Sequence, residues 1–311
     1  MKPPTRERFL SSGGELSYVD AGEGRPVVLL HGFPTSSYLW RREIPLFASR
    51  MRVIAPDLLG YGESEKPLGV DLSIRAQAAY VGELLASLDL REAAIVGHDL
   101  GGGVAQLLAT TGLVRSLVLV DSVAFDAWPT EAIRTVQRTG AERQTKEIVE
   151  RLVRVALEAG IEHPDALTPA DVEVFVAPWL ADHTAFFRAA RALDGDGLRG
   201  VEANLRAHGL PVFVIWGEAD AFLPASLAER LLDELPGSTV ALLPGCGHLV
   251  TEDAPTTVGP LILEFLRRWY LRETHTGHPT GAAPTVSPVP VEVFLERPPA
   301  GFGDDPYANE D

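Results

Sequence analysis

The stretch that decides the fold is Val96-Gly97-His98-Asp99-Leu100-Gly101-Gly102. A strand-like apolar run, 93–96, leads into it, and a helix-like run, 103–111, leads out. Glycines bracket one reactive side chain, as in a nucleophile elbow, where glycine permits a strained strand-to-helix turn and close backbone approach. The central residue of such turns is usually serine, and here it is Asp99. Because a carboxylate is ionised at neutral pH and suits attack on a saturated carbon, we expect chemistry other than ordinary ester hydrolysis.

A second segment, His31-Gly32-Phe33-Pro34, follows the apolar run 26–30. In this arrangement the loop after the third strand supplies one backbone N–H to an oxyanion hole, and the residue after the nucleophile supplies the other. The sequence therefore predicts the N–H groups of Phe33 and Leu100 as the oxyanion donors.

A base and an acid are predicted near the end of the folded region. The turn Gly245-Cys246-Gly247-His248 follows the strand-like run 239–243, and Asp220 follows the run 212–216. The chain order Asp99, Asp220, His248 matches nucleophile, acid and base. Asp121, at the end of the sixth predicted strand, is the alternative acid, and the pattern favours Asp220.

These motifs resemble the α/β-hydrolase family, in the branch of haloalkane dehalogenases and epoxide hydrolases. The runs HGFPTSSYLWR (31–41) and DLLGYGES (57–64) are especially similar to dehalogenases. The resemblance covers about residues 5–272. It agrees with a mechanism in which the Asp99 carboxylate forms an alkyl ester, which water activated by His248 then hydrolyses.

The leaving-group site departs from the pattern of these relatives. Dehalogenases carry Trp directly after the nucleophile and often Asn after His-Gly, whereas this chain has Leu100 and Phe33. Epoxide hydrolases use cap tyrosines, and the predicted cap, 122–208, contains no Tyr. The candidate leaving-group contacts in the cap are Trp128, Trp179 and His183.

The side-chain chemistry ranks the possible reactions. A departing halide needs only N–H donors, which a cap tryptophan supplies, whereas an opened epoxide leaves an alkoxide that needs an acid. The prediction therefore favours a haloalkane dehalogenase-like hydrolase acting on a small apolar substrate. The alternatives are an epoxide hydrolase, an esterase or lactonase in which Asp99 is a base, and a non-hydrolytic ligand-binding or biosynthetic tailoring protein.

The hydrophobic pattern predicts an α/β fold with a mostly parallel central sheet flanked by helices. Short apolar runs alternate with helical patterns, as in strands buried on both faces. The run 15–19 alternates, which predicts an antiparallel edge strand. A helical cap is expected after the sixth strand. The predicted division is a core of 1–121 and 209–272, a cap of 122–208, and a Pro/Gly/acid-rich tail of 273–311, disordered or loosely docked through 289–295.

Composition narrows the class of protein further. The chain has 311 residues and a net charge of −16, which argues against nucleic-acid and anionic-membrane partners. A single cysteine, Cys246, excludes an intrachain disulfide. We find no targeting segment or membrane span, and expect a cytoplasmic protein with a small-molecule substrate and without a metal or cofactor. The sequence indicates nothing about oligomeric state.

Overall fold

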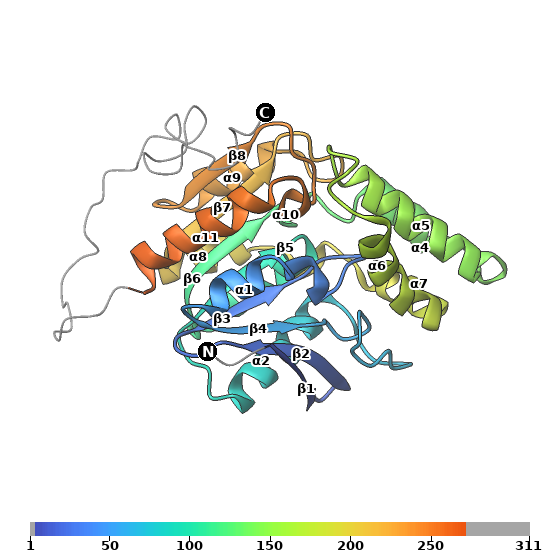
Figure 1. Ribbon diagram of the computed structural model, residues 1–311, viewed down its shortest axis with the longest axis horizontal. Helices are drawn as coiled ribbons and strands as arrows, with labels where there is room; N and C mark the ends of the chain where they lie inside the picture. The colour runs from blue at the N-terminus through green and yellow to red at the C-terminus, as the bar shows by residue number, and fades with distance from the viewer. Residues whose placement is uncertain (1–3, 272–311) are drawn as a thin grey trace, which may run out of the picture.

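The computed structural model describes residues 4–271, and it contains an eight-stranded sheet with helices on both faces (Figure 1). The strand order is β1-β2-β4-β3-β5-β6-β7-β8. The strands are β1 (Thr5–Leu10), β2 (Glu15–Ala21), β3 (Pro26–Leu30), β4 (Arg52–Pro56), β5 (Ala93–His98), β6 (Val114–Val120), β7 (Val212–Gly217) and β8 (Thr239–Leu243).

The six strands β3 to β8 run parallel to one another. Strand β2 pairs antiparallel with both β1 and β4. Every residue of β5 and β7 is buried, which agrees with the apolar runs in the sequence. The expectation that 15–19 forms an edge strand is wrong. This segment is antiparallel, but β1, which the sequence analysis did not identify, pairs with it and forms the edge.

The helices that cover the sheet form two groups, one on each of its faces. The first group is α1 (Glu43–Ala48) and α11 (Pro255–Trp269), which contact each other and lie in front of the strands in Figure 1. The second is α2 (Ile74–Ser87), α3 (Leu100–Ala109), α8 (Val201–His208) and α9 (Ser226–Glu234). Parallel strands need this cover because both of their faces are apolar.

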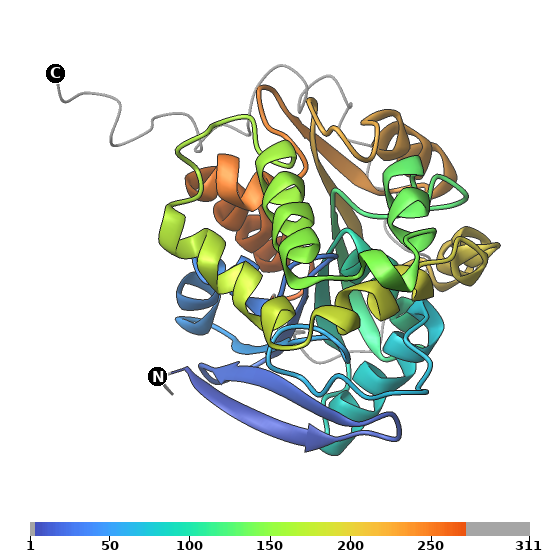
Figure 2. The same ribbon diagram turned by 90° about the vertical axis from the view of Figure 1, so that its right-hand side faces the viewer.

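A helical segment lies between β6 and β7, as the sequence predicts. Its helices are α4 (Glu131–Gln137), α5 (Lys146–Ala159), α6 (Pro169–Ala181) and α7 (His183–Ala192), followed by α8. Figures 1 and 2 show α4 to α7 gathered at one end of the sheet. Three of these helices begin after a threonine whose side chain accepts a backbone N–H, namely Thr130, Thr145 and Thr168. Such N-caps satisfy donors that the first turn leaves unpaired.

The division into core and cap stays a prediction. The predicted tail, 273–311, and its segment 289–295 lie outside the described residues. Within residues 4–271, no helix combines the length and the apolar character needed to cross a bilayer.

Candidate active site

Asp99 occupies a strained turn between β5 and α3. Its backbone has φ 49° and ψ −120°, a conformation that non-glycine residues rarely adopt. The turn fits only because its neighbours are small. A Cβ on Gly101 would lie 2.4 Å from the carbonyl oxygen of Leu30, and one on Gly32 would lie 2.5 Å from the Cβ of Asp99. The glycines thus allow the loop after β3 to approach Asp99 closely.

Two backbone N–H groups bind the Asp99 carboxylate. The N–H of Phe33 donates to Oδ2 of Asp99 over 2.9 Å, and that of Leu100 also bonds the carboxylate. These are the two donors that the sequence predicts. Burial raises the pKa of Asp99, whereas the charge of His248 and the two N–H groups oppose that rise. The Phe33 N–H dipole is therefore already directed at Oδ2 of the Asp99 carboxylate.

His248 is held by Asp220, as predicted. Nδ1 of His248 donates to Oδ2 of Asp220 over 2.8 Å, which leaves Nε2 for another partner. The other oxygen of Asp220 accepts the N–H groups of Phe222 and Leu223 at 2.8 and 2.9 Å. Burial by itself lowers the pKa of His248, but the charge and hydrogen bond of Asp220, together with Asp99, raise it to about 9. The acid therefore fixes both the tautomer and the charge of the imidazole.

Asp121, the alternative acid, does not bind His248. It is fully buried at the end of β6, and its Oδ1 accepts the N–H of Gly217 over 2.8 Å. Its Oδ2 has no hydrogen-bond partner among the described residues. Burial and the charge of Asp220 raise the pKa of Asp121 well above its usual range. Asp121 therefore supports the end of β7, the strand that precedes Asp220.

Two further histidines have structural partners. Nε2–H of His98 donates to the carbonyl oxygen of His248 over 2.9 Å, so the elbow and the histidine loop are joined directly. His31 accepts the N–H of Leu58 at 3.0 Å and thereby joins the loops after β3 and β4. The sequence gives no signal that His98 supports His248.

A cavity of about 370 Å³ lies above the elbow. Asp99 and His248 face it from the core, and the remaining walls are mostly apolar. Helices α4 and α5 contribute much of the lining, and Val155 on α5 is 54% exposed, so an apolar rim opens toward solvent. The lining from these two helices is Ala132, Ile133, Thr135, Val136, Leu152, Val155, Ala156, Leu157 and Ala159.

The structure separates the three candidate leaving-group contacts. Trp128 lines the cavity and is 4% exposed, and its Nε1 has no partner among the described residues. Nε1–H of Trp179 instead donates to the carbonyl oxygen of Pro34 over 2.7 Å. His183 is partly exposed at the start of α7 and is not among the residues that line the cavity. Of the three residues, only Trp128 lines the cavity, and its buried Nε1 has no partner among the described residues.

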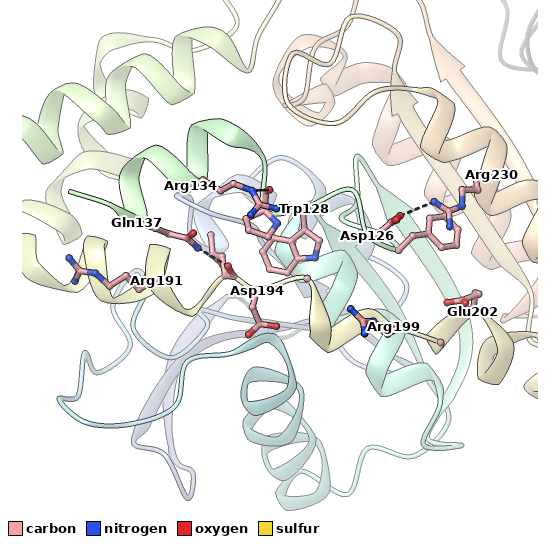
Figure 3. Close-up of a pocket in the computed structure, with 14 residues that line it drawn as sticks. Asp126, Trp128, Arg134, Gln137, Arg191, Asp194, Arg199, Glu202 and Arg230 are labelled. Atoms are coloured by element: carbon pink, nitrogen blue, oxygen red, sulfur yellow. Dashed lines mark hydrogen bonds and ion pairs between the residues drawn. The ribbon is translucent and has the colours of Figure 1, made fainter. Parts of the chain in front are cut away.

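Trp128 also lines a second cavity, of about 850 Å³ (Figure 3). Trp128 and Leu193 line both cavities and so form part of the wall between them. The second cavity is polar, and Figure 3 shows Arg134 beside Trp128 and Arg230 paired with Asp126. The two cavities therefore differ in character: the one at Asp99 is mostly apolar, and the one beside it is polar.

Metal-ligating side chains do not cluster in the part of the chain that the structure describes. Within residues 4–271, no group of three or more His, Cys, Asp or Glu side chains is arranged to hold a metal ion.

Comparison with known proteins agrees with the fold and the motifs. Residues 27–259 match the model of the alpha/beta hydrolase family. The chain is 33% identical over 271 residues to haloalkane dehalogenase 2 of Mycobacterium tuberculosis, covering 82% of this chain and 93% of that protein. It is 43% identical over 284 residues to a soluble epoxide hydrolase of a Corynebacterium species, covering 84% and 96%.

Comparison with a solved structure also identifies the alpha/beta hydrolase fold. An alpha/beta hydrolase fold protein from Burkholderia ambifaria superposes with a TM-score of 0.76 at 30% identity, covering 83% of this chain and 97% of that one. The fold, the family model and the named relatives point to one enzyme class. The chain belongs to the alpha/beta hydrolase family and is a hydrolase.

Proposed function

We propose that this hydrolase works through a covalent alkyl ester on Asp99. The observation that carries the proposal is the hydrogen bond from the Phe33 N–H to Oδ2 of Asp99. An esterase keeps its oxyanion donors for the carbonyl oxygen of the substrate. Here the donors hold the nucleophile's own oxygen, which becomes the ester carbonyl oxygen after alkylation. This arrangement supports a nucleophilic Asp99 over one that acts as a base.

The proposed reaction has two steps. First, a carboxylate oxygen of Asp99 attacks an sp³ carbon, the carbon–halogen bond breaks, and halide leaves with the bonding pair. The ester lacks the charge of Asp99 that helps to raise the pKa of His248, so the imidazole releases its proton to solvent. His248 then takes a proton from water, and the hydroxide adds to the ester carbonyl carbon. The N–H groups of Phe33 and Leu100 stabilise the tetrahedral oxyanion. Collapse expels the alkoxide, which takes the proton from His248 and leaves as the alcohol. The Asp99 carboxyl group then loses its proton to solvent and is a carboxylate again.

The cavity supports a neutral, apolar substrate. Its lining contains no Lys or Arg among the described residues, and the negative charge of Asp99 repels an anion. We assign the leaving-group contact to Trp128, because its N–H is unpaired and an indole N–H is a suitable donor to halide. Carbon–halogen cleavage therefore fits the chemistry of the lining best.

The second candidate is epoxide hydrolysis, which the similarity to the Corynebacterium soluble epoxide hydrolase favours. Ring opening creates an alkoxide, and an alkoxide needs an acid to protonate it. The polar cap groups that line the cavity are Thr130, Thr135 and Trp128, none of which is acidic. The structure therefore gives the epoxide reaction less support than the halide reaction.

The test is a panel of bromoalkanes, epoxides and aryl esters, with halide release, diol formation and pH change as separate readouts. Peptide mass spectrometry of the quenched reaction locates any adduct. The proposal predicts halide release and an adduct on the peptide that carries Asp99. Diol formation without halide release would promote the epoxide hydrolase. Tight binding of every compound without turnover would indicate a ligand-binding protein instead.

A further inference from the structure

Asp253, the last residue of α10 (Val250–Asp253), joins two segments that are far apart in the sequence. Its Oδ2 accepts the N–H of Gly247 over 2.8 Å, and Gly247 directly precedes His248. The same carboxylate accepts the N–H of Glu162 at 3.0 Å and that of His163 at 3.0 Å. One side chain therefore binds both the histidine loop and the segment that follows α5.

The two segments also touch directly. The N–H of Leu249 donates to the carbonyl oxygen of Gly160 over 2.7 Å. A Cβ on Gly247 would lie 2.8 Å from that same oxygen, so only glycine allows the two backbones to pack this closely. His248 thus lies between two residues whose N–H groups are tied to the neighbourhood of α5. Since α5 lines the active-site cavity, its position is linked to that of the imidazole.

The hydrogen bond from His248 to Asp220 cannot by itself fix the main chain of the histidine loop relative to α5. The bond at Nδ1 sets the tautomer and the direction of the ring, but it leaves the main chain of the loop to be fixed by other groups. A carboxylate that accepts several backbone N–H bonds makes charge-assisted bonds, which are stronger than neutral ones. Removing Asp253 would leave the three N–H groups of Gly247, Glu162 and His163 without that acceptor.

We propose that Asp253 is a positioning residue for the hydrolytic half-reaction. It fixes the main chain before His248 to the segment after α5, so that the imidazole is aligned with the water that attacks the ester. The inference rests on the proposed function, because it assumes an ester on Asp99. It follows that Asp253 affects the second step through His248 and leaves the attack by Asp99 almost unchanged.

The experiment is rapid quenching of a bromoalkane reaction, with intact-mass measurement of the fraction of alkylated enzyme. In Asp253→Ala, the alkylation rate should match that of the wild type, while ester hydrolysis slows between about ten- and a hundredfold. Alkyl-enzyme should therefore accumulate at steady state. Asp253→Asn retains one acceptor oxygen, so its rate of ester hydrolysis should lie between those of the wild type and Asp253→Ala. The matched control is Asp165→Ala, which removes an exposed acid from the segment between α5 and α6 that Asp253 binds.

A merely structural role gives a different pattern. If Asp253 only stabilised the fold, its loss would reduce the active fraction and lower both steps together, without accumulation of ester. Equal losses in both steps, or wild-type kinetics in Asp253→Ala, would overturn the inference. All variants are compared well below their melting temperatures, so that unfolding does not enter the rates.

Failure of the proposed function is recognised separately. The variant His248→Gln is run in the same series, and it should trap the ester whatever Asp253 does. If neither it nor the wild type forms an adduct with any electrophile of the panel, the covalent mechanism is wrong. If His248→Gln traps the ester and Asp253→Ala does not accumulate it, the positioning role alone is wrong.

Discussion

Nδ1 of His248 and Oδ2 of Asp220 are 2.8 Å apart, whereas the buried Asp121 bonds the backbone of Gly217 instead. We therefore expect Asp220→Asn to lower turnover by roughly 10³- to 10⁴-fold. The substitution removes the carboxylate that fixes the tautomer of the imidazole and the charge that stabilises its protonated form. Asp121→Asn keeps an acceptor for Gly217 and should change turnover only slightly. Steady-state rates of the two variants give the comparison, and the reverse order would move the acid to β6.

Replacement of His248 by Gln should separate the two steps. Asp99 is a carboxylate and needs no base to attack, whereas water does. The variant should therefore alkylate once and stop, and intact mass spectrometry should find a stable adduct on the Asp99 peptide. Asp99→Asn is the matched control, since it removes the nucleophile and should show no adduct. Multiple turnovers in His248→Gln would contradict the assignment of the base.

The two cap tryptophans should respond differently to replacement by phenylalanine. Trp128→Phe keeps an aromatic ring in the cavity wall but removes the unpaired N–H, so halide release should fall by at least about tenfold. Trp179→Phe instead leaves the buried Pro34 carbonyl without its donor, which should cost about 1 kcal/mol of stability. Halide assays and thermal melts measure the two effects. Equal halide release in the wild type and Trp128→Phe would remove Trp128 from the leaving-group site.

Glu43 on α1 should make the stability of the fold depend on pH. Burial, together with the charge of Glu252, raises the pKa of Glu43 from 4.5 to about 8. Between these values the folded protein holds a proton that the unfolded chain has released. The free energy of unfolding therefore falls as pH rises through this window, by up to a few kcal/mol, and the Glu43 contribution is constant above it.

The variant Glu43→Gln tests this, because glutamine keeps the shape of the neutral side chain and does not titrate. Its melting temperature relative to wild type should increase steadily from about pH 5 to about pH 8. Glu218→Gln, at an exposed position, is the control and should show little such trend. A difference between Glu43→Gln and wild type that does not vary with pH would show that the carboxyl group does not titrate in this window.

Much of the fold could be predicted because its signals are local. A strand buried on both faces must be apolar throughout, and the strained turn at Asp99 requires small neighbours whatever the rest of the chain does. The order of nucleophile, acid and base along the chain identified the three residues that the structure brings to one end of the sheet. The edge strand β1 escaped prediction, because an edge is defined by which strand lies next to another, and pairing is not local.

The leaving-group contact and the support of the histidine were decided by tertiary structure alone. Trp128 and Trp179 are the same residue type in the same predicted cap, and they differ only because a carbonyl 145 positions away, that of Pro34, binds one of them. Asp253 gives no signal in the sequence, since its three N–H partners become neighbours only when the segment after α5 packs on the histidine loop. Residue type and spacing determine which chemistry a chain offers, and long-range packing determines which donor is left unpaired to perform it.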